Sequence, residues 1–321
     1  MKSYKKYCEV RFLAAPRTGA YVGIEVETEA TIPYSYREVL GSSYHAERKE
    51  FTLANVWAAK EDGSLRNYGI EYISSPIKTY KPHVKALVDK LLTVPTLMKE
   101  CPRAGIHVHV NVTDMTQSNI WTMACIFWTL ENALVEWCGE SRVGNNFCLR
   151  LKDATRVVGA SVNAIRSVFV GTERDSFVSF HPNTHKYASL NLATVARLGT
   201  LEFRSLDGNL DSDRVNNWTE QLLLLRELAF KFEDPHKFFA WLDLQTDKVS
   251  IYKELLTPYF YKTLDIDNMY QRLYTDVGLA MTMAFACPDW DAFELGVVEK
   301  VTDRGKKFSE EEIGLNQPME N

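Results

Sequence analysis

The chain has 321 residues, a formal net charge of −5 and 45% apolar residues, which is ordinary for a globular protein with a large core. Its basic residues are scattered, so nucleic acid is not an expected partner. No apolar run is long enough to span a bilayer, and the basic start at Met1 is followed only by the short apolar run Phe12 to Ala15. We therefore expect a cytoplasmic protein without a membrane or signal segment.

Cysteine usage points away from disulfides and from a thiolate zinc site. The six cysteines lie far apart and include no C-x-x-C pair. Free, buried thiols are predicted at Cys8, Cys101, Cys125, Cys138, Cys148 and Cys287.

Strand-like segments dominate the first two thirds of the chain. Each is rich in β-branched or aromatic residues with a period of two. They cover residues 21–29, 55–60, 69–74, 105–112, 186–192 and 200–206. Helical spacing between them predicts a helix over 81–92, which Pro95 stops, and one over 116–138, which Gly139 ends.

The last third is predicted to be all helix. Asp211 is expected to cap a helix that runs to about residue 233, and Asp234-Pro235 ends it. Further helical patterns cover 235–244, 247–262, 266–286 and 288–299. We predict an α+β fold with a catalytic core over 1–210, a helical region over 211–304 packed on it, and a flexible tail over 305–321.

Three glutamates share one face of the first predicted strand. Because strand side chains alternate, Glu25, Glu27 and Glu29 oppose Ile24 and Val26. Neighbouring carboxylates repel one another and raise each other's pKa unless cations intervene. When an E-x-E pattern stands alone, a solvated strand face is its usual explanation.

Three more predicted strands combine an apolar face with polar or charged side chains. Their polar members are His107, His109 and Asn111 in one strand, Glu202 and Arg204 in another, and Glu71 in the third. Exposed polar faces, carboxylate-bound histidines or a cross-strand ion pair explain each strand separately. Together the four strands predict an antiparallel sheet whose second face is a site rather than a core.

The donor types indicate the metal. Glutamates with one or two imidazoles favour Mg²⁺ or Mn²⁺ over zinc, because hard oxygen ligands suit hard cations. Such ions commonly bridge nucleotide phosphates, and Arg204 on the same face is suited to contact a phosphate through two hydrogen bonds.

An ordered set of short motifs spans about residues 20–220. It runs through Gly23-x-Glu25-x-Glu27, Asp62-Gly63-Ser64-Leu65, Glu71 with Ser74 and Pro76, Gly105-x-His107-x-His109, Lys186-Tyr187 with Leu190-Asn191, and Glu202-Phe203-Arg204 with Trp218 beyond. This series resembles the amidoligase family of the glutamine synthetase and γ-glutamylcysteine ligase-like superfamily. Its specificity lies in the order of the motifs, since each one is short.

The resemblance implies a curved antiparallel sheet of about six strands with helices on one face. It also implies that the sheet holds ATP and two or more Mg²⁺ (or Mn²⁺) ions. In the implied reaction, a substrate carboxylate attacks the γ-phosphate of ATP, and an amine then captures the acyl phosphate.

Carried over position by position, the resemblance implies three sets of site residues. The metal ligands are Glu25, Glu27, Glu71, His109 and Glu202, and the catalytic residues are Arg204, Asp62 and His107. The nucleotide contacts are Arg204, Lys186, Asn191 and Arg150. Lys186 stands where many relatives have arginine, and Arg142 is a further candidate beside Arg150, although both arginines are also explained as solvated side chains.

Several questions stay open at the level of sequence. The carboxylate and amine substrates are expected to be small molecules, peptides or proteins, and an oligomer is compatible with the sequence. One alternative is a metal hydrolase or a cupin-like oxygenase that uses the H-x-H pair, although a cupin would have a glutamate a few residues beyond His109. The other alternative is a non-catalytic protein with the same metal site on the sheet.

Overall fold

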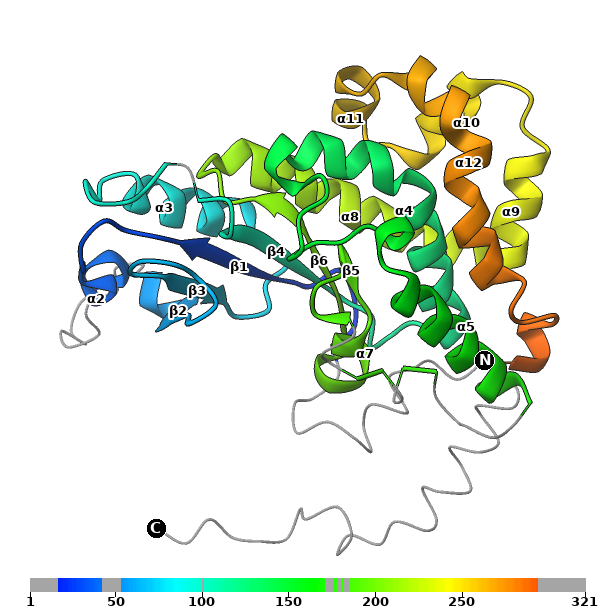
Figure 1. Ribbon diagram of the computed structural model, residues 1–321, viewed down its shortest axis with the longest axis horizontal. Coiled ribbons are helices and arrows are strands. Elements are labelled where there is room, and N and C mark those ends of the chain that lie inside the picture. The colour runs from blue at the N-terminus through cyan, green and yellow to red at the C-terminus, as the bar shows by residue number, and fades with distance from the viewer. Residues whose placement is uncertain are drawn as a thin grey trace, which may run out of the picture.

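An open, six-stranded antiparallel sheet lies at the centre of the fold, with its strands in the order β2-β3-β1-β4-β6-β5 (Figure 1). The computed structural model describes residues 17–41, 53–99, 101–170, 176–177, 180–181 and 185–293. The strands are β1 (Val22–Thr28), β2 (Trp57–Glu61), β3 (Ile70–Ser74), β4 (Gly105–Asn111), β5 (Leu190–Asn191) and β6 (Thr200–Asp207). The predicted α+β fold is confirmed.

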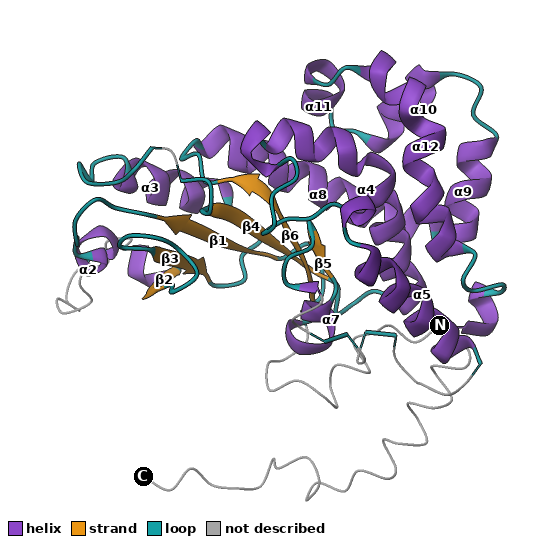
Figure 2. Cartoon of the chain, in the orientation of Figure 1, coloured by secondary structure: helices purple, strands orange, loops and turns teal. Residues whose placement is uncertain are grey.

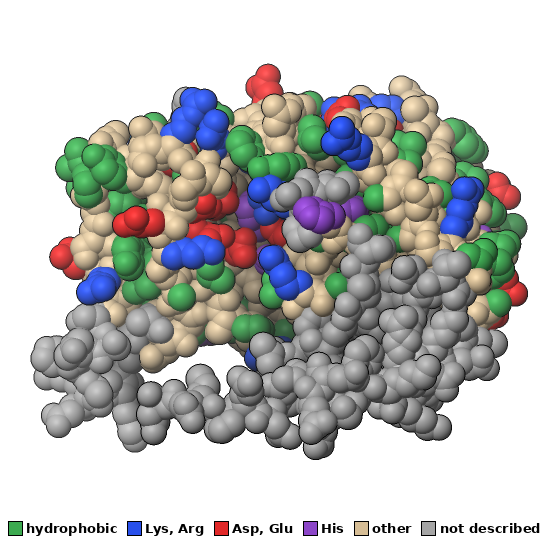
Figure 3. All heavy atoms as spheres, turned by 60° about the horizontal axis from the view of Figure 1, so that its bottom comes forward, with side chains coloured by type: hydrophobic (Ala, Val, Ile, Leu, Met, Phe, Trp, Pro, Cys, Tyr) green, Lys and Arg blue, Asp and Glu red, His purple; other side chains and the backbone are tan. Residues whose placement is uncertain are grey.

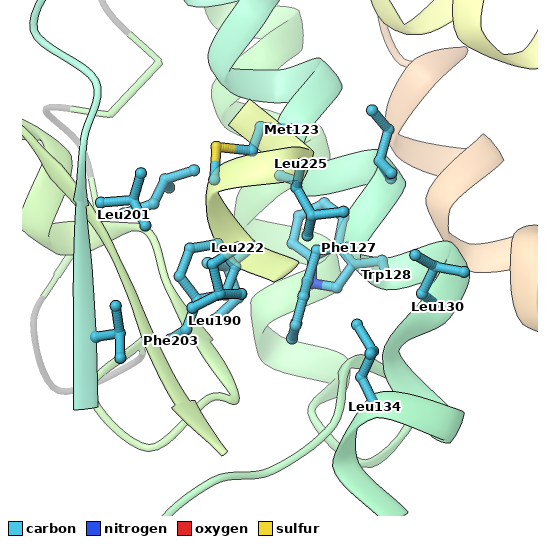
Figure 4. Close-up of a cluster of buried hydrophobic side chains, with 14 of the residues drawn as sticks. Met123, Phe127, Trp128, Leu130, Leu134, Leu190, Leu201, Phe203, Leu222 and Leu225 are labelled. Carbon is cyan, nitrogen blue, oxygen red and sulfur yellow. The ribbon is translucent and has the colours of Figure 1, made fainter. Parts of the chain in front are cut away.

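Helices cover one face of the sheet, as Figure 2 shows. They are α3 (Lys81–Leu91), α4 (Gln117–Cys138) and α8 (Ser212–Phe232). The apolar alternation of the strands meets them: Ile24, Val108 and Phe203 are all fully buried. In Figure 4, Phe203 of the sheet lies beside Leu222 of α8, and the rings of Phe203 and of Phe127 in α4 lie edge to face with centroids 5.0 Å apart.

Almost the whole circumference of α4 is buried, because a second layer of helices covers its outer side. This layer includes α5 (Thr155–Phe169), α9 (Pro235–Asp243) and α12 (Ile266–Ala284). The shorter helices are α2 (Tyr36–Leu40), α7 (Ala193–Leu198), α10 (Lys248–Leu255) and α11 (Pro258–Thr263). Three 3₁₀ turns are η1 (Leu53–Asn55), η2 (Glu140–Arg142) and η3 (Leu151–Asp153).

Side-chain caps define the helices of the last third. Asp211 accepts hydrogen bonds from the N–H groups of Asp213 and Arg214, which confirms the predicted cap. The single helix predicted over 247–262 is two helices, because Leu256 and Thr257 are extended before Pro258. A proline disfavours the helical conformation of the residue before it.

Other differences from the sequence predictions are small. Only Leu190–Asn191 of the segment 186–192 forms a strand, since Lys186 and Tyr187 lie in a turn. The helix α5 was not predicted. The described cysteines are free thiols, and all of these except the half-buried Cys101 are buried, while Cys8 lies outside the described residues.

The predicted tail over 305–321 and the end of the helix over 288–299 also lie outside the described residues. The division at residue 210 stays a prediction, although α8 packs directly on α4 and β4. Among the described helices, none is both long enough and apolar enough to cross a bilayer.

A candidate metal centre on the open face of the sheet

Among the described residues, two groups of side chains that could hold a metal ion lie on the face of the sheet opposite the helices. The first triad is Glu25, His109 and Glu202, and the second triad is Glu27, Asp62 and Glu71. Within each triad, ligand atoms lie within 4.8 Å of one another. Figure 3 shows acidic, basic and histidine side chains gathered on this side of the molecule.

The antiparallel register brings these side chains together. In β1 and β3, Glu27 lies directly opposite Glu71, and in β4 and β6, His109 lies directly opposite Glu202. Residues paired in this way project from the same face of a sheet, with their Cβ atoms about 5 Å apart. Two like charges are therefore held side by side at Glu27 and Glu71, where they repel each other unless a cation intervenes.

In the first triad, the His109 ring is oriented by Thr200. Nδ1 of His109 lies 3.0 Å from the Thr200 hydroxyl oxygen. Its Nε2 lies 3.2 Å from Glu25 Oε1, but Nε2 is buried and makes no aligned hydrogen bond. Burial opposes protonation of His109, yet Glu25 and Glu202 outweigh it and raise the pKa of the imidazole. The space between Nε2 and the carboxylates of Glu25 and Glu202 is therefore suited to a proton or a metal ion.

Glu202 is kept ionised by its partners. It accepts a hydrogen bond of 2.7 Å from Asn191 Nδ2 and forms an ion pair with Arg204. Burial alone would raise the pKa of Glu202, but His109 and Arg204 lower it below the ordinary value.

A β-bulge in β6 places Arg204. The pairing with β4 shifts between Ile106–Leu206 and Val108–Phe203, so two residues of β6, Arg204 and Ser205, oppose one residue of β4. The extra residue returns Leu206 to the core while Arg204 stays on the open face. Bulges of this kind often aim a side chain at a functional site.

His107 lies between the two triads. Its Nδ1 is 3.1 Å from Glu25 Oε2, and its Nε2 is 3.8 Å from Glu27 Oε1. Burial tends to raise the pKa of Glu25, but His107 and His109 reverse this effect and lower the pKa well below its ordinary value. Glu25 is therefore a carboxylate at neutral pH.

The second triad combines two strands and a loop. Glu27 accepts a hydrogen bond of 2.8 Å from the N–H of Gly105. Glu71 forms an ion pair of 2.7 Å with Lys60 in β2, but burial still raises the pKa of Glu71, and Glu25 adds to this effect. Asp62 stands in the loop between β2 and β3, where its Oδ1 accepts the N–H of Ser64 at 2.8 Å.

Glu29 does not join the other two glutamates of its strand, contrary to the sequence prediction. The strand β1 ends at Thr28, and Glu29 is buried beyond it. Its two carboxylate oxygens accept hydrogen bonds of 2.9 Å from the Arg66 N–H and from Asn67 Nδ2. Glu29 therefore holds the loop that carries Asp62.

Comparison with known protein families shows which family the chain belongs to. Residues 20–225, from two residues before β1 to within α8, match the model of a family described as "putative amidoligase enzyme". The chain belongs to this amidoligase family. Amidoligases are enzymes named for forming amide bonds. A comparison with curated proteins finds no match.

The amidoligase segment contains both triads. It also contains Lys186 and Arg150, two of the predicted nucleotide contacts. The ammonium group of Lys186 is exposed and lies 4.6 Å from the Tyr187 ring centroid. Arg150 is buried and pairs with Asp153 at 3.1 Å. Among the described residues, neither pairs with a member of a triad, so their nucleotide roles stay predictions.

Three further residues support the amidoligase site, and two of them, Thr200 and Lys60, were not predicted from the sequence. Thr200 orients His109, Lys60 neutralises Glu71 in part, and Arg142 supports the bulge. Far from being solvated, Arg142 is buried and donates hydrogen bonds to the carbonyls of Arg204 at 2.7 Å and Ser205 at 3.2 Å. Of the two residues that were not predicted, only Lys60 had a sequence signal, as a lysine one strand from Glu71.

The donor set fits divalent hard cations. It consists of carboxylates and one imidazole whose Nε2 has no aligned hydrogen-bond partner. Oxygen-rich sites of this kind favour Mg²⁺ or Mn²⁺. The contact between His109 Nδ1 and the Thr200 hydroxyl orients the imidazole ring, as outer contacts do for metal-binding histidines.

Proposed function

We propose that this protein is an ATP- and Mg²⁺-dependent carboxylate-amine ligase that acts through an acyl phosphate. The observation that carries this proposal is the pair of triads on one face of the sheet, with Arg204 beside the first. Membership of the amidoligase family supports amide-bond formation. The triads supply the charge that ATP-bound cations require.

The proposed reaction has two steps. A carboxylate oxygen of the first substrate attacks the γ-phosphorus of ATP, the bond to the β-phosphate oxygen breaks, and ADP leaves. An amine nitrogen then attacks the acyl carbon, the bond from carbon to the phosphate oxygen breaks, and inorganic phosphate leaves as the amine loses a proton. Mg²⁺, when bound, would neutralise charge on the phosphates.

The residues of the chain have separate roles in this proposal. Glu25, His109 and Glu202 would hold one ion, and Glu27, Asp62 and Glu71 a second. Arg204 would contact oxygens of the transferred phosphoryl group, because a guanidinium matches their spacing and charge. His107 would position Glu25 and Glu27, which it contacts on either side.

Amine-stimulated release of ADP tests the proposal. The full chain is incubated with Mg²⁺ and ATP while carboxylates and amines are screened for faster ADP release. In a pair that supports turnover, Glu25→Gln and Glu202→Gln should each lower kcat/KM by about 100-fold or more, because each removes one charge from the metal centre. The matched control is Glu136→Gln, which changes an exposed glutamate that pairs with Arg272 on the helix side.

Specific outcomes would favour other functions. Near-normal turnover in both variants would contradict the proposed site. Tight zinc binding without ADP release would favour a metal hydrolase. Calorimetry that detects no nucleotide binding in the presence of Mg²⁺ would favour a non-catalytic protein.

A further inference from the structure

A pocket of about 490 Å³ lies beside the metal centre and shares a wall with it. It lies between the segment that enters α2 and the loop between β2 and β3. Its lining includes Tyr34, Tyr36, Tyr68, Glu61 and Asp62. Since Asp62 also belongs to the second triad, a molecule in this pocket lies next to the proposed reaction site. The volume is within the range of small-molecule sites and far exceeds that of ammonia.

The tyrosine side of the pocket is held in place. The Tyr34 hydroxyl lies 2.9 Å from Thr28 Oγ1 and 3.0 Å from the Tyr72 hydroxyl. Tyr72 is fully buried in β3, so it anchors the Tyr34 ring to the sheet.

The loop side is also built for one conformation. Asp62 donates its N–H to the Gly69 carbonyl at 3.1 Å and accepts the Leu65 N–H at 3.2 Å on its own carbonyl. Asn67 has a positive φ of 55°, and Glu29 accepts a hydrogen bond from its side chain. A Cβ at Gly69 would lie 2.4 Å from Leu65 Cβ, so a side chain there would force the loop to shift. The pocket therefore exists before a ligand binds.

The lining favours a cation. Tyrosine rings attract ammonium groups through their π faces, and Glu61 adds a carboxylate that belongs to neither triad. The described residues that line the pocket include no lysine or arginine. An anionic or purely apolar ligand would leave this negative charge uncompensated.

The pocket and the second triad lie on different sides of the same hairpin. Lys60 pairs with Glu71 toward the triad, whereas Glu61 pairs with Ile70, which faces the core side. A ligand group that binds beside Glu61 is therefore separated from the second triad by the width of the loop between β2 and β3. A ligand that engages both sides needs a chain between its two ends.

We propose that this pocket binds the far end of the amine substrate, and that this substrate is an alkyl diamine or a larger molecule with the same two-ended chemistry. One ammonium group lies among the tyrosine rings and Glu61, and the alkyl chain carries the reacting amine past Asp62. This inference rests on the proposed ligase function for the reacting end only. The pocket itself is a cation site regardless of catalysis.

Calorimetry with two probe molecules tests the pocket directly. 1,5-Diaminopentane has an ammonium group at each end, and 1,5-pentanediol has the same chain with a neutral hydroxyl group at each end. The diamine should bind the full chain at least about fivefold more tightly, since an ammonium group on aromatic faces is typically worth about 0.5–1 kcal/mol at accessible sites and carboxylates add to this. Equal affinities, or no binding of the diamine, would overturn the proposal.

Pocket variants locate the binding. Tyr68 is 49% exposed, so Tyr68→Ala should leave the fold intact. Tyr68→Ala and Glu61→Gln should each weaken diamine binding about three- to tenfold, while Tyr68→Phe, which keeps the ring, should stay within about twofold of the wild type. Unchanged affinity in both Tyr68→Ala and Glu61→Gln would place the diamine elsewhere and reject the pocket.

Turnover separates this proposal from the ligase proposal. If the diamine binds as expected but no amine stimulates ADP release, the pocket stands and the ligase function fails. If ammonium stimulates ADP release but the diamine does not bind, the ligase function stands and the pocket proposal fails. If both hold, Tyr68→Ala should raise the KM for the diamine and leave the KM for ammonium unchanged.

Discussion

His109 shows how a neighbour that touches no substrate can set the chemistry of a side chain. Its Nδ1 contacts the Thr200 hydroxyl, while its Nε2 faces the carboxylate of Glu25. When Nδ1–H donates to Thr200, the Nε2 lone pair points at the first triad and is available to a metal ion. The hydroxyl of Thr200 is thus expected to contribute to metal affinity without being a ligand.

The variant Thr200→Val tests this orientation. It keeps the size and branching of the side chain but removes the hydroxyl, so Mn²⁺ affinity should fall about tenfold, as is typical when an outer contact of a metal-binding histidine is lost. Electron paramagnetic resonance titration of free Mn²⁺ measures the change. Thr200→Ser retains the hydroxyl and should bind Mn²⁺ as the wild type does; equal affinity of the valine variant would refute this role of Thr200.

Sequence alternation was sufficient to place some residues and insufficient for others. Glu25, Glu27 and His109 were expected on one face because each stands in a strand with a strict period of two. Thr200 was not recognised and Glu29 was wrongly grouped with Glu25 and Glu27, because their partners depend on strand register and on loop conformation. Neither property follows from the residues near them in the sequence.

At the scale of elements, Glu131 ties α4 to two segments that lead to the site. It is buried in α4, accepts the Leu151 N–H at 2.8 Å, and accepts a hydrogen bond from the Ser189 hydroxyl. Ser189 directly precedes β5, whose Asn191 donates to Glu202. Burial raises the pKa of Glu131 to about 7, although Ser189 and the Leu151 N–H act in the opposite direction.

This raised pKa predicts a pH dependence of folding stability. The folded pKa of about 7 exceeds the ordinary value of 4.5, so the folded state binds the proton more tightly than the unfolded state. The resulting stability is fully present below about pH 4.5 and is lost as the pH rises through about 7. Between about pH 5 and 8, the wild type should lose about 2–3 kcal/mol of unfolding free energy relative to Glu131→Gln.

Urea unfolding at the two pH values measures this difference. Glu136→Gln changes an exposed glutamate on the same helix and should keep the pH dependence of the wild type. Parallel pH profiles for the wild type and Glu131→Gln would show that Glu131 titrates at its ordinary value.

Predictions of the elements succeeded where the periodic pattern was long and failed where it was short or interrupted. The helix α4 was predicted to within one residue, since polar Thr116 precedes it and Gly139 follows it. The two-residue strand β5 was overestimated, because the turn at Lys186 cannot be read from its β-prone neighbours. In α5, β-branched residues and Gly159 weaken the helical signal, although its apolar residues have helical spacing.

At the scale of the whole molecule, the sheet separates a packed face from a charged one. The helices bury the apolar face, so the repulsion among carboxylates is confined to the open face. The partner cations that the described residues supply there are Lys60 and Arg204. A bound divalent ion should therefore stabilise the entire fold, because the unfolded chain does not assemble either triad.

Thermal unfolding with and without Mg²⁺ tests this coupling. At a concentration about 100-fold above its Kd, Mg²⁺ should add about 2.7 kcal/mol to the unfolding free energy. For a protein of 321 residues, that corresponds to a rise in Tm of about 4 °C. The double variant Glu25→Gln with Glu27→Gln should show a higher Tm without Mg²⁺ and a smaller rise with it. A rise no greater than KCl produces at matched ionic strength would contradict specific binding.

The order of the strands in the sheet has a consequence for how the protein is made. The first triad needs Glu25 from β1 and Glu202 from β6, and β4 lies between these two strands in the sheet. During synthesis, β1 therefore emerges from the ribosome long before its last ligand partner. The first triad stays incomplete until β6 has been synthesised. The ion of this triad can therefore be bound only late in translation.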